Sequence, residues 1–170
     1  MKTAAIFLII ICNIFGMEQK ASIKSAHAAP CISLAEAEKV LGEPAVLLNN
    51  TTSEKDGIRE SNCGYAAKTA DPEKHVTGSV YVTVKQYPSA AAAQKAYTDI
   101  VVANRMMAGQ EKVAIGDEGY YHTDGEHFHL FIFRKDREMA AMKINKITSK
   151  TSLPELRKLA EAMAGKRATL

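Results

Sequence analysis

Residues 113–145 read VAIGDEGYYHTDGEHFHLFIFRKDREMAAMKIN. Within residues 127–134, Phe128, Leu130 and Ile132 are expected to point to one side and the residues between them to the other, which is the period of a β-strand. Both sides are apolar toward the C-terminal end, as in a central strand. Two segments separate the strands: Asp124-Gly125, which is typical of a two-residue hairpin turn, and residues 135–137. The stretch therefore predicts a β-meander of three antiparallel strands, the first of which begins at Tyr120.

The chain before this meander predicts a helix followed by three strands. Ser33 and Glu36 have the spacing of a capping box, which predicts a helix over Leu34–Leu41. The polar, turn-rich residues 49–58 are expected to form a loop. The strands are expected at residues 45–48, 59–68 and 78–87. In the last of these, three valines (Val80, Val82 and Val84) alternate with Tyr81, Thr83 and Lys85, which is the period of a strand with one covered face.

Two more helices are expected, over residues 90–107 and 153–164, each preceded by a serine that can cap it. The order is then helix, strands, helix, strands, helix. Short turns between successive strands favour antiparallel pairing. We therefore predict an α+β fold, with an antiparallel sheet of about six strands packed by two or three helices on one face.

The N-terminus has the features of a secretory signal peptide. Lys2 precedes an apolar run over residues 4–15, and Ala26-His27-Ala28 is a small-x-small cleavage pattern. We predict a signal peptide over residues 1–28 and a single α+β domain over residues 29–170. An uncleaved anchor remains the alternative, although a membrane span needs about 20 apolar residues.

Export places the mature protein in the periplasm or outside the cell, with no membrane span after cleavage. The formal charge of the whole chain is +3. Three lysines and one glutamate leave with the signal peptide, so the mature chain is close to neutral. Nucleic-acid binding needs a clustered basic face, and we expect no nucleic-acid partner.

Three cysteines occur in the sequence. Cys12 lies in the signal peptide and follows Ile11, where a lipidation signal needs a small residue, so we do not expect a lipid anchor. Cys31 and Cys63 remain, and an even number of cysteines in an oxidising compartment predicts that they form a disulfide. A redox or metal pair is the alternative, which their wide spacing disfavours.

Three histidines of the meander form the candidate metal site. His127 and His129 lie on one side of a predicted strand, and His122 lies across the hairpin. Asp117 and Glu118 could add oxygen ligands, and such a set suits zinc or copper. The alternative is that these histidines only mark the solvated end of a strand.

Residues 116–119 (GDEG) are followed by neither the lysine nor the helix of a phosphate-binding loop, so we interpret them as a tight turn. The chain also lacks a Gly-x-Ser-x-Gly nucleophile motif. We therefore expect a domain without enzymatic activity and without a required cofactor.

Several short motifs resemble a group of small exported bacterial proteins and lipoproteins of unknown function. The resemblance implies an exported α+β domain with one disulfide, and it implies no activity. The lipid anchor of the group is not matched in this chain. The motifs are Cys31 before Ser-Leu-x-Glu-Ala, Gly42-x-Pro44, Cys63-Gly64-Tyr65, Val82-x-Val84-x-x-Tyr87 before Ser-Ala, and Ile-Gly-Asp-Glu-Gly-Tyr-Tyr at residues 115–121.

Three functions follow from these observations. The first is an exported, non-enzymatic domain that binds an unknown protein or a small ligand, with Tyr81, Thr83 and Tyr87 on one candidate surface. The second is a periplasmic metal-binding protein that uses the histidine cluster. The third is an enzyme whose residues come together only in the fold.

Overall fold

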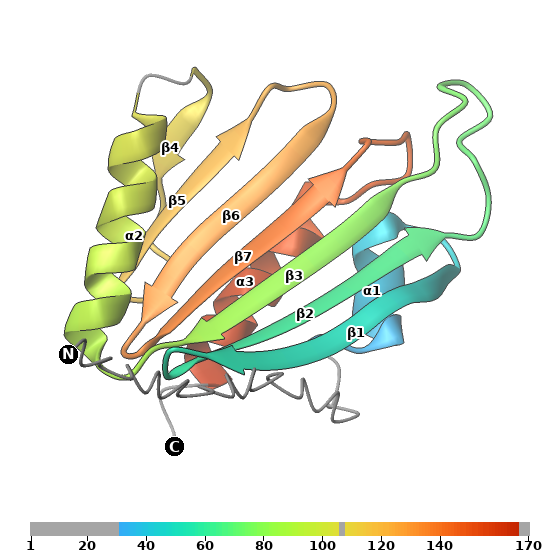
Figure 1. Ribbon diagram of the computed structural model, residues 1–170. Helices are drawn as coiled ribbons and strands as arrows, with labels where there is room; N and C mark the ends of the chain where they lie inside the picture. The colour runs from blue at the N-terminus through green and yellow to red at the C-terminus, as the bar shows by residue number, and fades with distance from the viewer. Residues whose placement is uncertain (1–30, 106–107, 167–170) are drawn as a thin grey trace, which may run out of the picture.

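The computed structural model describes residues 31–105 and 108–166, so the signal peptide predicted over residues 1–28 lies outside the described residues. Within the described ranges, the chain forms three helices and a seven-stranded antiparallel sheet (Figure 1). The predicted α+β class is confirmed, with seven strands where about six were expected. No helix in these ranges is both long and apolar enough to cross a membrane.

Every helix begins at a position that the sequence predicts. Ser33 caps α1 through a reciprocal capping box with Glu36, and Ser89 accepts a hydrogen bond from the N–H of Ala92 at the start of α2. The elements in order are α1 (Leu34–Leu41), β1 (Ala45–Lys55), β2 (Ile58–Ala67), β3 (Ser79–Gln86), α2 (Ala90–Asn104), β4 (Gln110–Lys112), β5 (Glu118–Thr123), β6 (Phe128–Lys135), β7 (Glu138–Asn145) and α3 (Leu153–Lys166).

The strand order across the sheet is β1-β2-β3-β7-β6-β5-β4. Each half of the chain builds one side, and the last strands of the two halves, β3 and β7, pair in the middle. Their register runs from Ser79 opposite Asn145 to Gln86 opposite Glu138. The short strand β4, which the sequence pattern did not reveal, forms the edge next to β5.

The β1–β2 hairpin corrects one prediction. Residues 49–58 were expected to form a loop, but β1 continues through most of them to Lys55, which pairs with Ile58. Asp56 and Gly57 form the two-residue turn, with φ angles of 53° and 73°. Positive φ at both positions is the geometry that Asp-Gly favours in hairpins. Most of the polar residues 49–55 of β1 are exposed at the edge of the sheet, as are the apolar side chains of Val46, Leu47 and Leu48.

The β5–β6 hairpin is longer than its Asp-Gly sequence predicts. The last pair of this hairpin is Thr123 opposite His129, so the connection is more than a two-residue turn. The Asp124 carboxylate organises it, because Oδ1 accepts hydrogen bonds from the backbone N–H groups of Glu126, His127 and Phe128. These bonds place the pKa of Asp124 well below its usual value.

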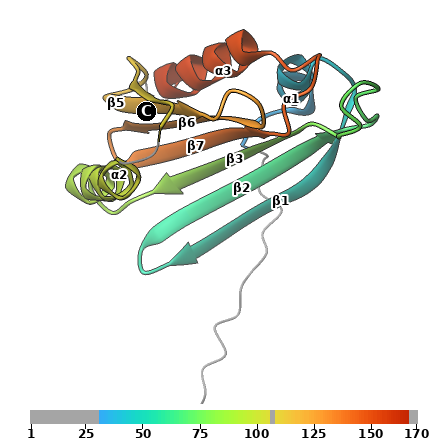
Figure 2. The ribbon, with the colours of Figure 1, turned by 90° about the horizontal axis from the view of Figure 1, so that it is seen from above.

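The helices lie on both faces of the sheet, not on one as predicted. Seen from above, α1 and α3 cover one face and α2 lies on the other (Figure 2). We call these the α1/α3 face and the α2 face. A stripe of apolar residues shows that a helix is buried on one side, but it does not determine which face of the sheet the helix covers.

The α1/α3 face holds the larger core. It includes Val80 and Val82 of β3, Phe131 and Phe133 of β6, and Met142 of β7, all at most 2% exposed. The predicted alternation in β3 is thereby confirmed. The smaller core of the α2 face comprises Tyr87, Ala93, Tyr97, Tyr120, Ile132 and Met139.

Candidate functional site

The three histidines of the predicted metal site point in different directions. His122 pairs with Leu130 and lies on the α2 face, where its buried ring meets the Phe128 ring edge-on at 5.0 Å between centroids. His129 lies on the opposite face and is hydrogen-bonded through Nδ1 to the Tyr121 hydroxyl at 2.7 Å. Burial lowers the pKa of His129, so its ring is neutral at neutral pH.

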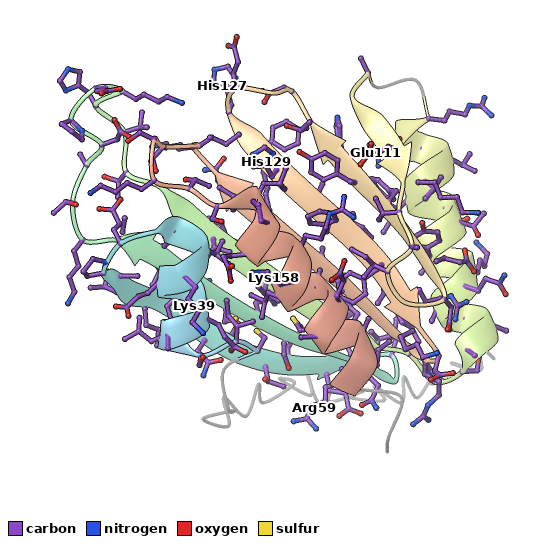
Figure 3. The ribbon with its side chains drawn as sticks, turned by 180° about the vertical axis from the view of Figure 1, so that it is seen from behind. Lys39, Arg59, Glu111, His127, His129 and Lys158 are labelled. Atoms are coloured by element: carbon purple, nitrogen blue, oxygen red, sulfur yellow. The ribbon has the colours of Figure 1, made fainter. Side chains whose placement is uncertain are left out.

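His127 stands at the tip of the β5–β6 hairpin, away from His129 (Figure 3). It is exposed, and its Nδ1 lies 2.8 Å from the Asp124 carboxylate. The described part of the chain contains no group of three or more His, Cys, Asp or Glu side chains that could hold a metal ion. The structure therefore does not bring His122, His127 and His129 together as ligands.

The two cysteines of the predicted disulfide do come together. Cys31 and Cys63 lie 2.6 Å apart at their closest approach. The Tyr65 hydroxyl donates a 2.7 Å hydrogen bond to the Ile32 carbonyl oxygen and so holds the segment before α1 against β2. A Cys31–Cys63 disulfide remains our prediction.

The GDEG segment forms an ion-pair cluster with Arg134, which is 9% exposed. The Arg134 guanidinium donates to the Asp117 and Glu118 carboxylates, at 3.0 Å each, and to the Asp136 carbonyl oxygen at 3.0 Å. Glycine at position 116 allows this segment to lie close to the backbone of β6, because a Cβ there would be only 2.3 Å from the Arg134 carbonyl oxygen. Only the first half of this segment precedes the strand, with Gly116 at a φ of 69°. Glu118 and Gly119 already belong to β5, which therefore begins two residues before the predicted start at Tyr120.

A cleft of about 590 Å³ opens beside this cluster, between α2 and the β4–β5 pair. Its walls are one side of α2 from Gln94 to the C-cap residue Arg105, all of β4, and the first three residues of β5. Tyr97 and Tyr120 form its deepest part, since they are only 7% and 5% exposed. Their ring centroids are 6.3 Å apart and the rings are tilted by 56°.

The polar groups of the cleft are held in defined states. Burial, reinforced by the Glu118 carboxylate, raises the pKa of Tyr97 to about 12, so its hydroxyl keeps its proton at neutral pH. Burial also raises the pKa of Tyr120. The Glu118 carboxylate is fixed by Arg134 at 3.0 Å. The cleft thus combines an aromatic floor, hydroxyl donors and an engaged carboxylate.

Sequence reasoning did not identify this cleft as a site. The stripe on α2 predicted that Tyr97 is packed, and GDEG drew attention to Glu118, but nothing linked the two segments. The third wall is β4, a strand of only three residues with no clear pattern. A polar Gln-Glu-Lys segment between a helix and a meander gives little indication of a strand.

No protein-family model matches the chain, and no curated protein matches it significantly. A function therefore has to be argued from the residues of the site.

Proposed function

We propose that this chain is an exported, non-enzymatic domain that binds a small ligand with an apolar or aromatic body in the cleft between α2 and β4–β5. The observation that carries the proposal is the floor of two buried tyrosines in a cleft of about 590 Å³. Binding sites for small molecules commonly have volumes of about 300–1,000 Å³ and an apolar lining with a few fixed polar groups.

Two polar groups of the cleft are suited to orienting a ligand. Arg134 holds the Glu118 carboxylate through Oε1 at 3.0 Å, which fixes its direction, and Tyr97 keeps its proton at neutral pH, so that its hydroxyl can donate a hydrogen bond. Fixed donors and acceptors of this kind are typical of binding sites for small molecules.

Export is supported by the predicted signal peptide and by the proximity of the two cysteines of the mature chain. Export is tested by measuring the intact molecular mass of the protein that a secreting host releases, since this mass gives the position of the mature N-terminus. A mature N-terminus close to residue 29 is expected, and recovery of the full-length chain in the cytoplasm would contradict export.

A neutral fluorescent probe, phenylnaphthylamine, tests the cleft directly. We expect its fluorescence to rise on mixing with the purified mature protein. Gln94→Trp should weaken binding at least tenfold, because Gln94 is an exposed residue whose enlarged side chain would fill the cleft. The matched control is Val102→Trp, since Val102 lies on α2, is 51% exposed and does not line the cleft.

A second cleft-filling variant, Val101→Trp, should have the same effect as Gln94→Trp, because Val101 also lines the cleft. Thermal unfolding of each variant establishes that it is folded. The proposal fails if the parent protein does not bind the probe, or if the folded cleft variants bind it as well as Val102→Trp does.

A further inference from the structure

The charges that line the cleft are not balanced. Its charged residues are Arg105, Glu111, Lys112 and Glu118. Both acidic residues pair with arginines that do not line the cleft. Arg134 holds Glu118 at 3.0 Å, and Arg157 of α3 lies 3.6 Å from the Glu111 carboxylate. Their negative charge is therefore already compensated from within the protein.

The two basic residues have no such compensation. Arg105 and Lys112 are exposed, and neither has an acidic partner within ion-pair distance in the described parts of the chain. One projects from the C-cap of α2 and the other from the end of β4. The unpaired charge at the cleft is therefore positive.

The end of α2 could oppose this, because the C-terminus of a helix carries a partial negative charge. Two of its last four carbonyl groups are already satisfied. The Arg105 N–H donates to the Val102 carbonyl oxygen at 3.3 Å, and the Gln110 amide donates to the Asn104 carbonyl oxygen at 2.5 Å. These internal hydrogen bonds reduce the negative potential that the helix end directs at the cleft.

We infer that the cleft takes a small amphipathic anion, whose aromatic or apolar body packs on Tyr97 and Tyr120 and whose carboxylate, sulfonate or phosphate group lies near Arg105 and Lys112. This inference rests on the proposed function and adds the charge of the ligand to it. The protonated Tyr97 hydroxyl is a further donor for such a ligand.

Two probes with the same aromatic core separate charge from shape. Phenylnaphthylamine is neutral, and anilinonaphthalene sulfonate carries one sulfonate on the same skeleton. We expect the parent protein to bind the sulfonate about three- to tenfold more tightly at low salt, which is the range that exposed charge pairs provide. Raising NaCl from about 20 to about 200 mM should remove most of this preference, because exposed charges are screened.

The charge-reversal variants Arg105→Glu and Lys112→Glu should each weaken sulfonate binding about three- to tenfold and change phenylnaphthylamine binding less than about twofold. Lys68→Glu is the matched control, since Lys68 is an exposed lysine beyond the end of β2 and outside the cleft. It should leave the affinities for both probes unchanged. Circular dichroism establishes that all variants are folded, since anilinonaphthalene sulfonate also binds partly unfolded chains.

Equal affinities for the two probes, or equal responses of both to Arg105→Glu and Lys112→Glu, overturn the anion preference and leave the proposed function standing. If both probes bind but Gln94→Trp weakens neither interaction, the proposed function itself is wrong.

Discussion

The two faces of the sheet differ in what they bury. The α1/α3 face holds the larger core, in which Phe131 and Met142 have no exposed surface and Tyr65 and Tyr121 are also buried. The smaller core of the α2 face contains three tyrosines beside the nearly buried Arg134 guanidinium, and next to them lies a cleft. Polar groups packed beside a cleft stabilise a fold less than a close-packed apolar core does, but they give a ligand partners. The difference indicates that stability rests mainly on the α1/α3 face, and it agrees with the ligand binding that we propose for the α2 face.

Neighbouring residues of β6 provide the strongest test, because Phe131 and Ile132 point to opposite faces. Phe131→Ala should lower the free energy of unfolding by about 4 kcal/mol, and Ile132→Ala by about 2 kcal/mol, because the smaller core beside the cleft can relax more easily. Urea unfolding followed by circular dichroism measures both values. An equal or larger loss at Ile132 would contradict the comparison.

The predicted Cys31–Cys63 disulfide belongs to the α1/α3 face. Closing a loop of about 33 residues stabilises a folded chain by about 3–4 kcal/mol in the chain-entropy model. Replacing both cysteines with alanine should therefore lower the free energy of unfolding by about 3 kcal/mol. Intact mass with and without reductant checks the bond itself. If protein that was purified without reductant shows two free thiols after denaturation, the disulfide prediction is wrong.

On the α2 face, Arg134→Met should cost about 2 kcal/mol, because it leaves the partly buried Asp117 and Glu118 carboxylates without their guanidinium. The control is Arg137→Met at the exposed β6–β7 turn, which should change stability by less than about 0.5 kcal/mol. Chemical unfolding at neutral pH compares the two variants.

The same cluster predicts a dependence on pH. Hydrogen bonds from the Lys135 ammonium and the Asp136 backbone N–H lower the pKa of Asp117 below 3.8 in the folded protein. A carboxyl group with a lowered pKa stabilises the fold above its unfolded-state pKa, and this contribution is lost as the pH falls through the folded-state value. The melting temperature of the parent should therefore fall more steeply below about pH 4 than that of Asp117→Asn. Parallel curves would contradict the assignment.

The smallest effect on stability is expected in the cleft. Gln94→Trp should leave the melting temperature within about two degrees of the parent value, because Gln94 is exposed and surface changes are usually small. Thermal unfolding without ligand measures this. A large loss of stability would show that the cleft wall is part of the core.

Local signals in the sequence predicted local structure well. The Ser33–Glu36 capping box placed α1 over Leu34–Leu41, as the structure has it. The alternating valines identified β3, and the meander appears as β5, β6 and β7. In each case the deciding interaction joins residues close in the chain or depends on a simple period.

The incorrect predictions concern features that depend on partners far away in the chain or on the choice between similar turns. Asp56-Gly57 is the two-residue hairpin, while Asp124-Gly125 begins a longer loop because the Asp124 carboxylate binds three successive backbone N–H groups nearby. The face chosen by α2 and the meeting of Tyr97 with Tyr120 depend on tertiary packing. For that reason the cleft was not predictable, and the histidine cluster that was predicted does not form.

The pairing of β3 with β7 also has a consequence for how the chain folds. The centre of the sheet joins positions such as Ser79 and Asn145, which are 66 residues apart. Until β7 pairs with it, β3 is the open edge of the β1–β2–β3 unit, with the backbone groups along one side unpaired. Long-range pairing of this kind slows folding, and an unpaired strand edge favours association between chains. The centre of the folded sheet is thus an exposed edge in any partly folded chain that lacks β7.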